Sequence, residues 1–299
     1  MKKGNFIWHL LALITVFIWG TTFVSTKYLI MKGVGSVEIM VLRFIVAYVV
    51  LLAVYPKFGF AGKKEEFKFL LMGAAGGSIY FISENSALQY TLASNVALIV
   101  CMAPVLTAIL AHFMTKDEKL KLPVIVGFLT AITGIALIVF NGKFILKLNP
   151  AGDFLALGSA LSWAFYSIFL KNTGEKYNYI FITRKILFYS IITSIPFIIF
   201  SKERASFMKI FEPGVFLNIV FLGVVASALC YIIWHNCINK IGMVVSSNYI
   251  YLSPLITIIS SNLIIGENIT WLIAAGGALI IGGVFIAQRV VEKDCEIHG

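Results

Sequence analysis

Long apolar runs, separated by short polar stretches, fill almost the whole of the 299-residue chain. A helix of roughly 20 apolar residues is long enough to cross the hydrocarbon core of a bilayer. Each run of this kind therefore predicts one membrane-spanning helix. The expected spans are residues 7–28, 36–55, 67–88, 93–114, 122–140, 152–171, 180–200, 213–236, 243–265 and 269–288.

The arrangement of the apolar residues decides between helices and strands. A membrane β-strand would alternate polar and apolar residues over about ten positions, whereas these runs are continuously apolar. Prolines that fall at or between the ends of the runs, where a missing backbone N–H costs little, are Pro56, Pro123, Pro150 and Pro213. The predicted fold class is all-α, a polytopic membrane protein of about ten transmembrane helices.

The composition excludes a water-soluble domain. Hydrophobic residues make up 60% of the chain and charged residues 13%, against roughly 45–50% and about 25% in ordinary globular domains. Too few polar residues are left to cover a soluble core. The net charge of +10 does not indicate nucleic-acid binding, because the basic residues lie mainly in short loops between the apolar runs.

Basic residues in the loops predict the orientation in the membrane. With those in or at the edge of the runs set aside, thirteen Lys and Arg residues lie on the side of the N-terminus and six on the other side. Cytoplasmic loops carry the excess of Lys and Arg. We therefore expect a multi-pass protein of the plasma (inner) membrane with both termini in the cytoplasm. The first apolar run has no small-residue cleavage site, so we expect it to be retained rather than removed as a signal peptide.

The two halves of the chain resemble each other. "FIWGTTFVSTKYL" (17–29) is similar to "LSWAFYSIFLKNT" (161–173), and "SNVALIVCMAPVLTAILA" (94–111) to "SSNYIYLSPLITIISS" (246–261). The matched pairs include Trp19 and Trp163, Lys27 and Lys171, and Pro104 and Pro254. Chance similarity between apolar helices is the alternative, but the order and spacing of these residues weigh against it.

This similarity predicts two repeats, residues 1–145 and residues 146–299, with five helices each. Because five is an odd number, the second repeat would enter the membrane from the opposite side. Inverted repeats of this kind are typical of transporters that work by alternating access.

Glu84 is the only acidic residue that we place well inside a predicted span. An ionised carboxylate within the bilayer is costly unless it is paired or hydrated, so such residues usually mark a functional site. Its chemistry suits proton coupling or the binding of a cationic solute. A structural alternative stays open, in which Glu84 lies at headgroup level or pairs with Arg43 or Lys27.

Glu84 and Asn85 align with His235 and Asn236 at an offset of 151 residues. Histidine titrates near neutral pH, so His235 is a second candidate for carrying protons. A histidine near the cytoplasmic headgroups is the ordinary alternative. The two asparagines either bind solute or tie neighbouring helices together.

Aromatic and basic residues in the spans are further candidates. Those expected to line a cavity, with ordinary helix packing as the alternative, are Trp19, Trp163, Tyr166 and Tyr80. Tyr80 lies one helical turn before Glu84 and shares its face. Lys27, Arg43 and Lys171 lie near the ends of their spans, where they either extend to the membrane edge or bind an anionic group.

Pro104 and Pro254 lie in the middle of repeat-related spans. Each removes one hydrogen bond of the helix and displaces the carbonyl four residues earlier, at Val100 and Ile250. Such a carbonyl needs another partner inside a membrane. We expect kinks that shape or gate a cavity, with a purely static bend as the alternative.

These features resemble the drug/metabolite transporter superfamily, in its ten-helix EamA-type branch. The resemblance covers nearly the whole chain. It rests on "WG" and "WA" in the first and sixth spans, "ALQYTLASNVALIVCMAPVLTAIL", "GENIT" after the ninth span, and glycine-rich fifth and tenth spans. It implies a central cavity between the halves, inward–outward switching, and transport of amino acids, other metabolites or drugs. Glu84 departs from the family pattern, because many relatives carry an uncharged residue there.

The function we expect is secondary-active transport of a small metabolite by alternating access. The solute would be an amino acid, a similar polar or amphipathic solute, or a drug-like compound, and proton coupling through Glu84 is an added hypothesis. The chain has no P-loop, so ATP is not expected to drive it. Expected partners are the solute, the lipid bilayer and protons, without nucleic acid, and a monomer and a homodimer both stay open.

No cofactor or metal site is expected, because the cysteines show no CxxC spacing and the histidines no HExxH motif. Two other functions stay open. A membrane scaffold or receptor would need a partner-binding surface that the short loops do not offer. An intramembrane enzyme would need clustered carboxylates or a serine beside His235. The sequence therefore predicts a protein that is not an enzyme.

Overall fold

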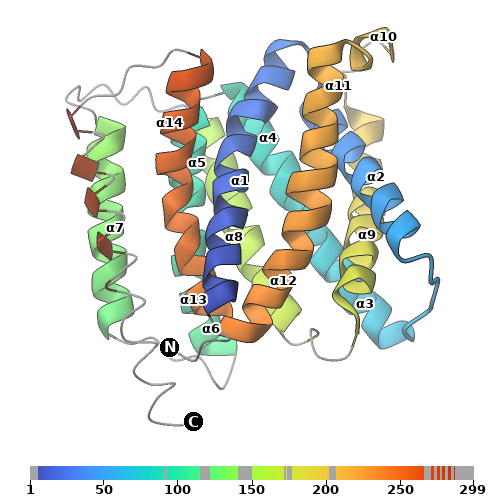
Figure 1. Cartoon of the computed structure of the whole chain (residues 1–299), viewed down its shortest axis with the longest axis horizontal. Coiled ribbons are helices and arrows are strands. Elements are labelled where there is room, and N and C mark those ends of the chain that lie inside the picture. The colour runs from blue at the N-terminus through green and yellow to red at the C-terminus, as the bar shows by residue number, and fades with distance from the viewer. Residues whose placement is uncertain are drawn as a thin grey trace.

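In the computed structural model of the chain, every element among the described residues is a helix (Figure 1). The structure describes residues 6–90, 93–114, 122–140, 150–171, 173, 177–201 and 207–265, and part of 271–286. The α-helices are α1 (Phe6–Met31), α2 (Ser36–Val54), α3 (Lys63–Gly73), α4 (Tyr80–Tyr90), α5 (Ala93–Val100), α6 (Ala103–Met114), α7 (Leu122–Phe140), α8 (Pro150–Lys171), α9 (Tyr179–Phe200), α10 (Phe207–Ile210), α11 (Pro213–Val220), α12 (Cys230–Ile241), α13 (Met243–Asn248) and α14 (Ser253–Ile265). Two π-helical segments, η1 (Ala74–Ile79) and η2 (Phe221–Leu229), and one 3₁₀ segment, η3 (Tyr249–Leu252), complete them. The all-α prediction is confirmed.

Membrane-spanning helices are present in both halves. The helical stretches that are long and apolar enough to cross a bilayer are Phe6–Met31, Ser36–Val54, Ala151–Lys171, Tyr179–Phe200 and Pro213–Ile241. They match the first, second, sixth, seventh and eighth predicted spans. The fifth predicted span corresponds to α7. The third, fourth and ninth predicted spans are divided between shorter elements, and the tenth is described only in part. A polytopic membrane fold is therefore supported, while the number of ten spans stays a prediction.

Repeat-related segments run in opposite directions through the bundle. In Figure 1, α3 lies at the lower end and α4 at the upper end, whereas α11 lies at the upper end and α12 at the lower end. Similarly, α5 lies above α6, and α14 lies above α13. The main helix contacts cross between the halves, because α1 packs on α12 and α14, α2 on α9 and η2, and α4 on α8. The core therefore lies between two antiparallel sets of helices.

The two π-helical segments interrupt repeat-related spans and fasten the halves together. A π-helical turn departs from the regular α-helical hydrogen-bond ladder and often marks a functional site. The Ala75 carbonyl in η1 accepts a hydrogen bond from Ser162 Oγ at 2.7 Å, and the Ala226 carbonyl in η2 accepts one from Trp19 Nε1 at 3.0 Å. The two alanines are 151 residues apart in sequence. Equivalent carbonyls thus accept hydrogen bonds from side chains on the first helix of the opposite half.

Glycines allow these segments to approach their neighbours closely. A Cβ atom at Gly76 would collide with the ring of Tyr166, and one at Gly73 would lie 2.7 Å from the Cβ atom of Tyr189. We expect Gly76→Ala to lower the thermal unfolding temperature in detergent, because overpacking a buried contact costs about 1–3 kcal/mol. Gly158→Ala is the matched control, since its Cβ atom would meet nothing within 4 Å. Equal unfolding temperatures for the two variants would contradict this packing.

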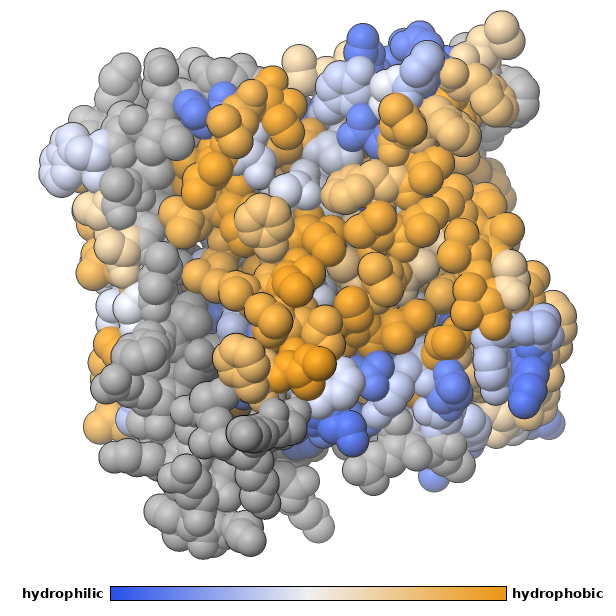
Figure 2. Space-filling model, viewed as in Figure 1, coloured by the Kyte–Doolittle hydropathy of each residue, from blue (hydrophilic) through white to orange (hydrophobic). Residues whose placement is uncertain are grey.

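An apolar band covers one face of the bundle. Figure 2 shows hydrophobic residues across the face formed by α1, α11 and α12, with hydrophilic residues gathered toward the upper and lower ends. Exposed large apolar side chains on α1, α11 and the adjoining η2 include Phe17, Phe216, Leu217 and Leu229. Soluble monomers rarely expose so continuous an apolar surface, whereas a bilayer covers it.

Candidate functional site

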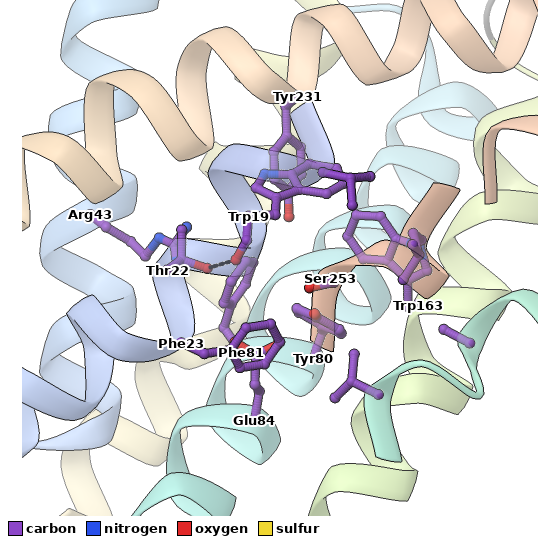
Figure 3. Close-up of a pocket in the computed structure, with 14 residues that line it drawn as sticks. Trp19, Thr22, Phe23, Arg43, Tyr80, Phe81, Glu84, Trp163, Tyr231 and Ser253 are labelled. Atoms are coloured by element: carbon purple, nitrogen blue, oxygen red, sulfur yellow. Dashed lines mark hydrogen bonds between the residues drawn. The ribbon is translucent and has the colours of Figure 1, made fainter. Parts of the chain in front are cut away.

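A cavity lies between the two halves, near the midpoint of α1. The space inside it that water-sized molecules can reach is about 40 Å³. Its lining comes from α1, α2, α4, α5, α6, α8, α12, η3 and α14 (Figure 3). The lining residues are Val16, Trp19, Thr22, Phe23, Arg43, Tyr80, Phe81, Glu84, Val100, Ala103, Trp163, Tyr231, Ile250 and Ser253. Both halves therefore contribute to one site.

Aromatic rings form much of the cavity wall. The repeat-related residues Trp19 and Trp163 have ring centroids 5.3 Å apart at an interplanar angle of 85°. The ring of Tyr80 lies 5.1 Å from that of Trp163. Tyr231 donates a hydrogen bond from its hydroxyl to the Gly76 carbonyl at 2.9 Å. These contacts between opposite halves hold a rigid, largely apolar surface in place.

Glu84 lies in this wall and is 3% exposed. The hydroxyl of Tyr80, one helical turn earlier on α4, is a polar neighbour of its carboxylate. Among the ion pairs of the described residues, none joins Glu84 to Arg43. Glu84 is therefore buried within the protein at the cavity and makes no direct ion pair with Arg43.

Arg43 also lines the cavity, although its position near the start of a span predicted that it either extends to the membrane edge or binds an anion. It is the eighth residue of α2 and only 1% exposed. Its Nε atom donates a hydrogen bond to Ser227 Oγ at 2.9 Å, and its guanidinium carbon lies 4.3 Å from the centroid of the Phe81 ring. Its Nη1 atom has no hydrogen-bond partner among the described residues. The hydroxyl and the ring therefore hold the cation inside the bundle rather than at its edge.

His235 and Tyr166 lie behind the cavity wall rather than in it. His235 Nε2 lies 2.6 Å from the Tyr166 hydroxyl, and its Nδ1 lies 3.0 Å from Thr183 Oγ1. Because the Thr183 hydroxyl donates to the Tyr179 carbonyl at 2.8 Å, it accepts from Nδ1–H, and Nε2 then accepts from Tyr166. A neutral imidazole satisfies every one of these bonds. His235 thus joins α8, α9 and α12 to one another.

The other polar candidates lie away from the cavity lining. Asn85 Nδ2 donates to a backbone carbonyl at the start of α2 at 3.0 Å, and Asn236 Nδ2 donates to a carbonyl one turn earlier in its own helix at 2.8 Å. Lys27 Nζ donates to a carbonyl near the end of α4 at 2.5 Å. Lys171 is the last residue of α8 and is partly exposed. Asn85 and Lys27 therefore tie helix ends together.

Pro104 and Pro254 begin helices instead of bending them. The fourth span breaks at Cys101 and Met102 before α6, and η3 precedes α14, so each proline is the second residue of its helix. Proline is tolerated in the first turn of a helix. The Ile250 carbonyl, four residues before Pro254, accepts a hydrogen bond from Cys101 Sγ at 3.2 Å. The displaced carbonyl is thus bonded across the halves.

Several lining residues were not identified from the sequence. Tyr231 lies 151 residues after Tyr80, so the offset that relates Glu84 to His235 also pointed to it. Ser227, which holds Arg43, is related by the same offset to a glycine, and the repeat therefore gave no signal for it. Thr22, Phe23, Phe81 and Ser253 are residue types that are common in apolar helices and carry no distinct signal.

Polar contacts join the halves at the end of the bundle where α2 ends. The guanidinium of Arg184 on α9 donates hydrogen bonds to the backbone carbonyls of Tyr55 and Lys57. Beside it, Glu66 on α3 accepts from Lys185 Nζ on α9 at 2.6 Å. The two halves are therefore closed against each other at this end.

Comparison with known proteins gives consistent similarities. The family model described as the EamA-like transporter family matches residues 6–140 and again residues 150–288. Two proteins of Archaeoglobus fulgidus, each named an uncharacterized transporter, are 25% and 26% identical over 93% and 97% of this chain and 96% and 99% of their own lengths. An uncharacterized transporter of Clostridium kluyveri is 26% identical over 98% of this chain and 95% of its own length.

A solved crystal structure of a protein is also similar, with a TM-score of 0.73 at 17% sequence identity. The match covers 95% of this chain and 98% of that chain. At this level of identity the likeness concerns the fold alone.

Proposed function

Since the chain belongs to the EamA-like transporter family, and is a membrane transporter rather than an enzyme, we propose that it carries a small metabolite across the membrane by secondary-active transport. The family match confirms the resemblance seen in the sequence. The observation that carries the proposal is the cavity between antiparallel halves, with Glu84 and Arg43 in an otherwise largely aromatic wall. Such a site suits an amphipathic solute.

Alternating access is the proposed mechanism. Residues 1–145 and 146–299 act as two inverted five-helix repeats, and each half adopts in turn the conformation that its partner has left. The equivalent bonds from Trp19 to η2 and from Ser162 to η1 support this exchange of roles. In the plasma membrane, with both termini in the cytoplasm, the contacts of Arg184 and Glu66 close the cytoplasmic side. They separate when the site opens inward.

Glu84 supplies the proposed coupling to protons. A buried carboxylate that binds a cationic group of the solute cannot carry its own proton at the same time. Protonation on one side of the membrane therefore releases the solute, and binding of solute on the other side releases the proton. His235 has no part in this step, because its hydrogen bonds are satisfied within the second half.

Uptake into proteoliposomes tests the proposal. The purified chain is reconstituted and supplied with a mixture of ¹³C-labelled amino acids, amines and carboxylic acids, and the internal contents are measured by mass spectrometry. We expect at least one solute to enter faster than into protein-free liposomes, with saturation at high concentration. A solute that stabilises the protein against unfolding but never enters the vesicles would instead support a receptor.

A further inference from the structure

The cavity wall holds two opposite charges that are not in direct contact. Arg43 enters from α2 and Glu84 from α4, and no ion pair of 4.0 Å or less joins them in the part of the chain that the structure describes (Figure 3). Both side chains are almost fully buried. A buried charge without a counterion is costly, and a group of opposite charge placed beside it removes that cost. Arg43 and Glu84 attract each other without direct contact, so a solute with charges of both signs can pair with both residues.

Two buried residues, on opposite sides of the cavity in Figure 3, offer hydrogen-bond donors. Arg43 Nη1 and Trp163 Nε1 have no hydrogen-bond partner among the described residues, and both residues line the cavity. A buried donor that lacks an acceptor carries a desolvation penalty. A carboxylate supplies two oxygens that match the planar guanidinium. The side of the cavity at Arg43 therefore suits an anionic group.

The side of the cavity at Glu84 offers acceptors. The Glu84 carboxylate has about four lone-pair sites on its two oxygens, of which the nearby Tyr80 hydroxyl can occupy one at most. An ammonium group has three donors and fits the remaining sites. The rings of Trp19 and Tyr231, which contact each other elsewhere in the wall, present apolar surface to the rest of the solute. This side therefore suits a cationic group with an apolar body nearby.

We infer that the cavity binds a zwitterionic solute with an apolar body, its anionic group at Arg43 and its cationic group at Glu84. With Glu84 ionised, the wall carries one positive and one negative charge, so a solute with both charges leaves neither residue unpaired. An amine or an acid alone leaves one buried charge without a counterion. The inference rests on the proposed transport function and names the class of solute for that same site.

Three probes with one carbon skeleton test the inference. Leucine carries both charges, isopentylamine lacks the carboxylate, and 4-methylpentanoate lacks the amine. Binding to the purified full chain is followed at pH 7 by the fluorescence of the protein's tryptophans. None of the three probes absorbs light at the wavelengths used. We expect leucine to bind at least about ten-fold more tightly than either other probe, because a site built for a polar group rejects the analogue that lacks it. Comparable binding of a single-charge probe, or no binding of any probe, overturns the inference.

Variants assign the two charges. Glu84→Gln should reduce the preference for leucine over 4-methylpentanoate to about two-fold or less. Arg43→Gln should reduce the preference for leucine over isopentylamine to the same extent. The exposed residues Glu212 and Lys240 provide the matched controls Glu212→Gln and Lys240→Gln, which should keep the preference of the unmodified chain. If Arg43→Gln does not fold, Arg43→Lys keeps the charge and should keep part of the preference. Unchanged preferences in the Glu84 and Arg43 variants overturn the assignment.

Transport separates the two proposals. If leucine binds as expected but never enters proteoliposomes, the transport function fails and the inference about the site stands. If other solutes are transported while leucine neither binds nor competes, the inference fails and the transport function stands.

Discussion

Stimulation of uptake by an imposed pH gradient is expected to disappear when Glu84 is replaced by glutamine. Glutamine keeps the size of the side chain and a carbonyl oxygen near the Tyr80 hydroxyl, but it cannot take up and release a proton. The ratio of initial uptake rates with and without the gradient measures coupling separately from affinity. We expect this ratio to be at least about ten for the unmodified chain and about one for Glu84→Gln, since the carboxylate carries the proton.

Glu212→Gln is the control for this experiment, because Glu212 is an exposed residue that precedes α11. It removes the same charge without touching the cavity and should keep the full response to the gradient. If Glu84→Gln keeps the full stimulation of uptake by the pH gradient, Glu84 is not the coupling residue. The cavity would then remain as a path without that coupling group.

The cavity residues that could be predicted were those that stand out in the sequence by their charge, their helical spacing or their place in the repeat. A carboxylate is rare in an apolar helix, so Glu84 was conspicuous, and the helical period placed Tyr80 on the same face. Trp19 and Trp163 were found because the two halves carry them at matching positions. All four line the cavity.

The surroundings of His235 and Arg43 could not be predicted from helical periodicity or from the repeat. His235 is related to Glu84 by the repeat, but its ring meets Thr183 and Tyr166 within the second half, so a matched position did not mean a matched environment. Arg43 lines the cavity because Ser227 and Phe81 hold it there. Both outcomes depend on residues distant in sequence, which helical periodicity does not report.

The interruptions of the spans were only partly predictable. Proline removes one hydrogen bond, which indicated a disturbance near Val100 and Ile250. Whether the helix bends or breaks depends on which group donates a hydrogen bond to the displaced carbonyl. For Ile250, one such donor is Cys101 in the opposite half. The π-helical segments were not predicted. Gly76, inside the first of them, packs against Tyr166 in the opposite half, a contact that the sequence alone does not reveal.

Movement of the two halves against each other, which opens the cavity in the proposed mechanism, can be tested with a reversible crosslink at the closed end. Glu66 on α3 and Lys185 on α9 belong to different halves and lie 2.6 Å apart between Oε1 and Nζ. Cysteines at both positions, in a variant whose native cysteines are replaced and which still transports, can be joined by a bifunctional methanethiosulfonate reagent. Uptake into proteoliposomes is then measured before crosslinking, after crosslinking and after reduction.

We predict that crosslinking lowers uptake at least about ten-fold and that reduction restores it, because the site must open at this end during each cycle. The two single-cysteine variants, Glu66→Cys and Lys185→Cys, should keep their activity under the same treatment. Full uptake in the crosslinked protein would contradict movement between the halves and with it the proposed mechanism.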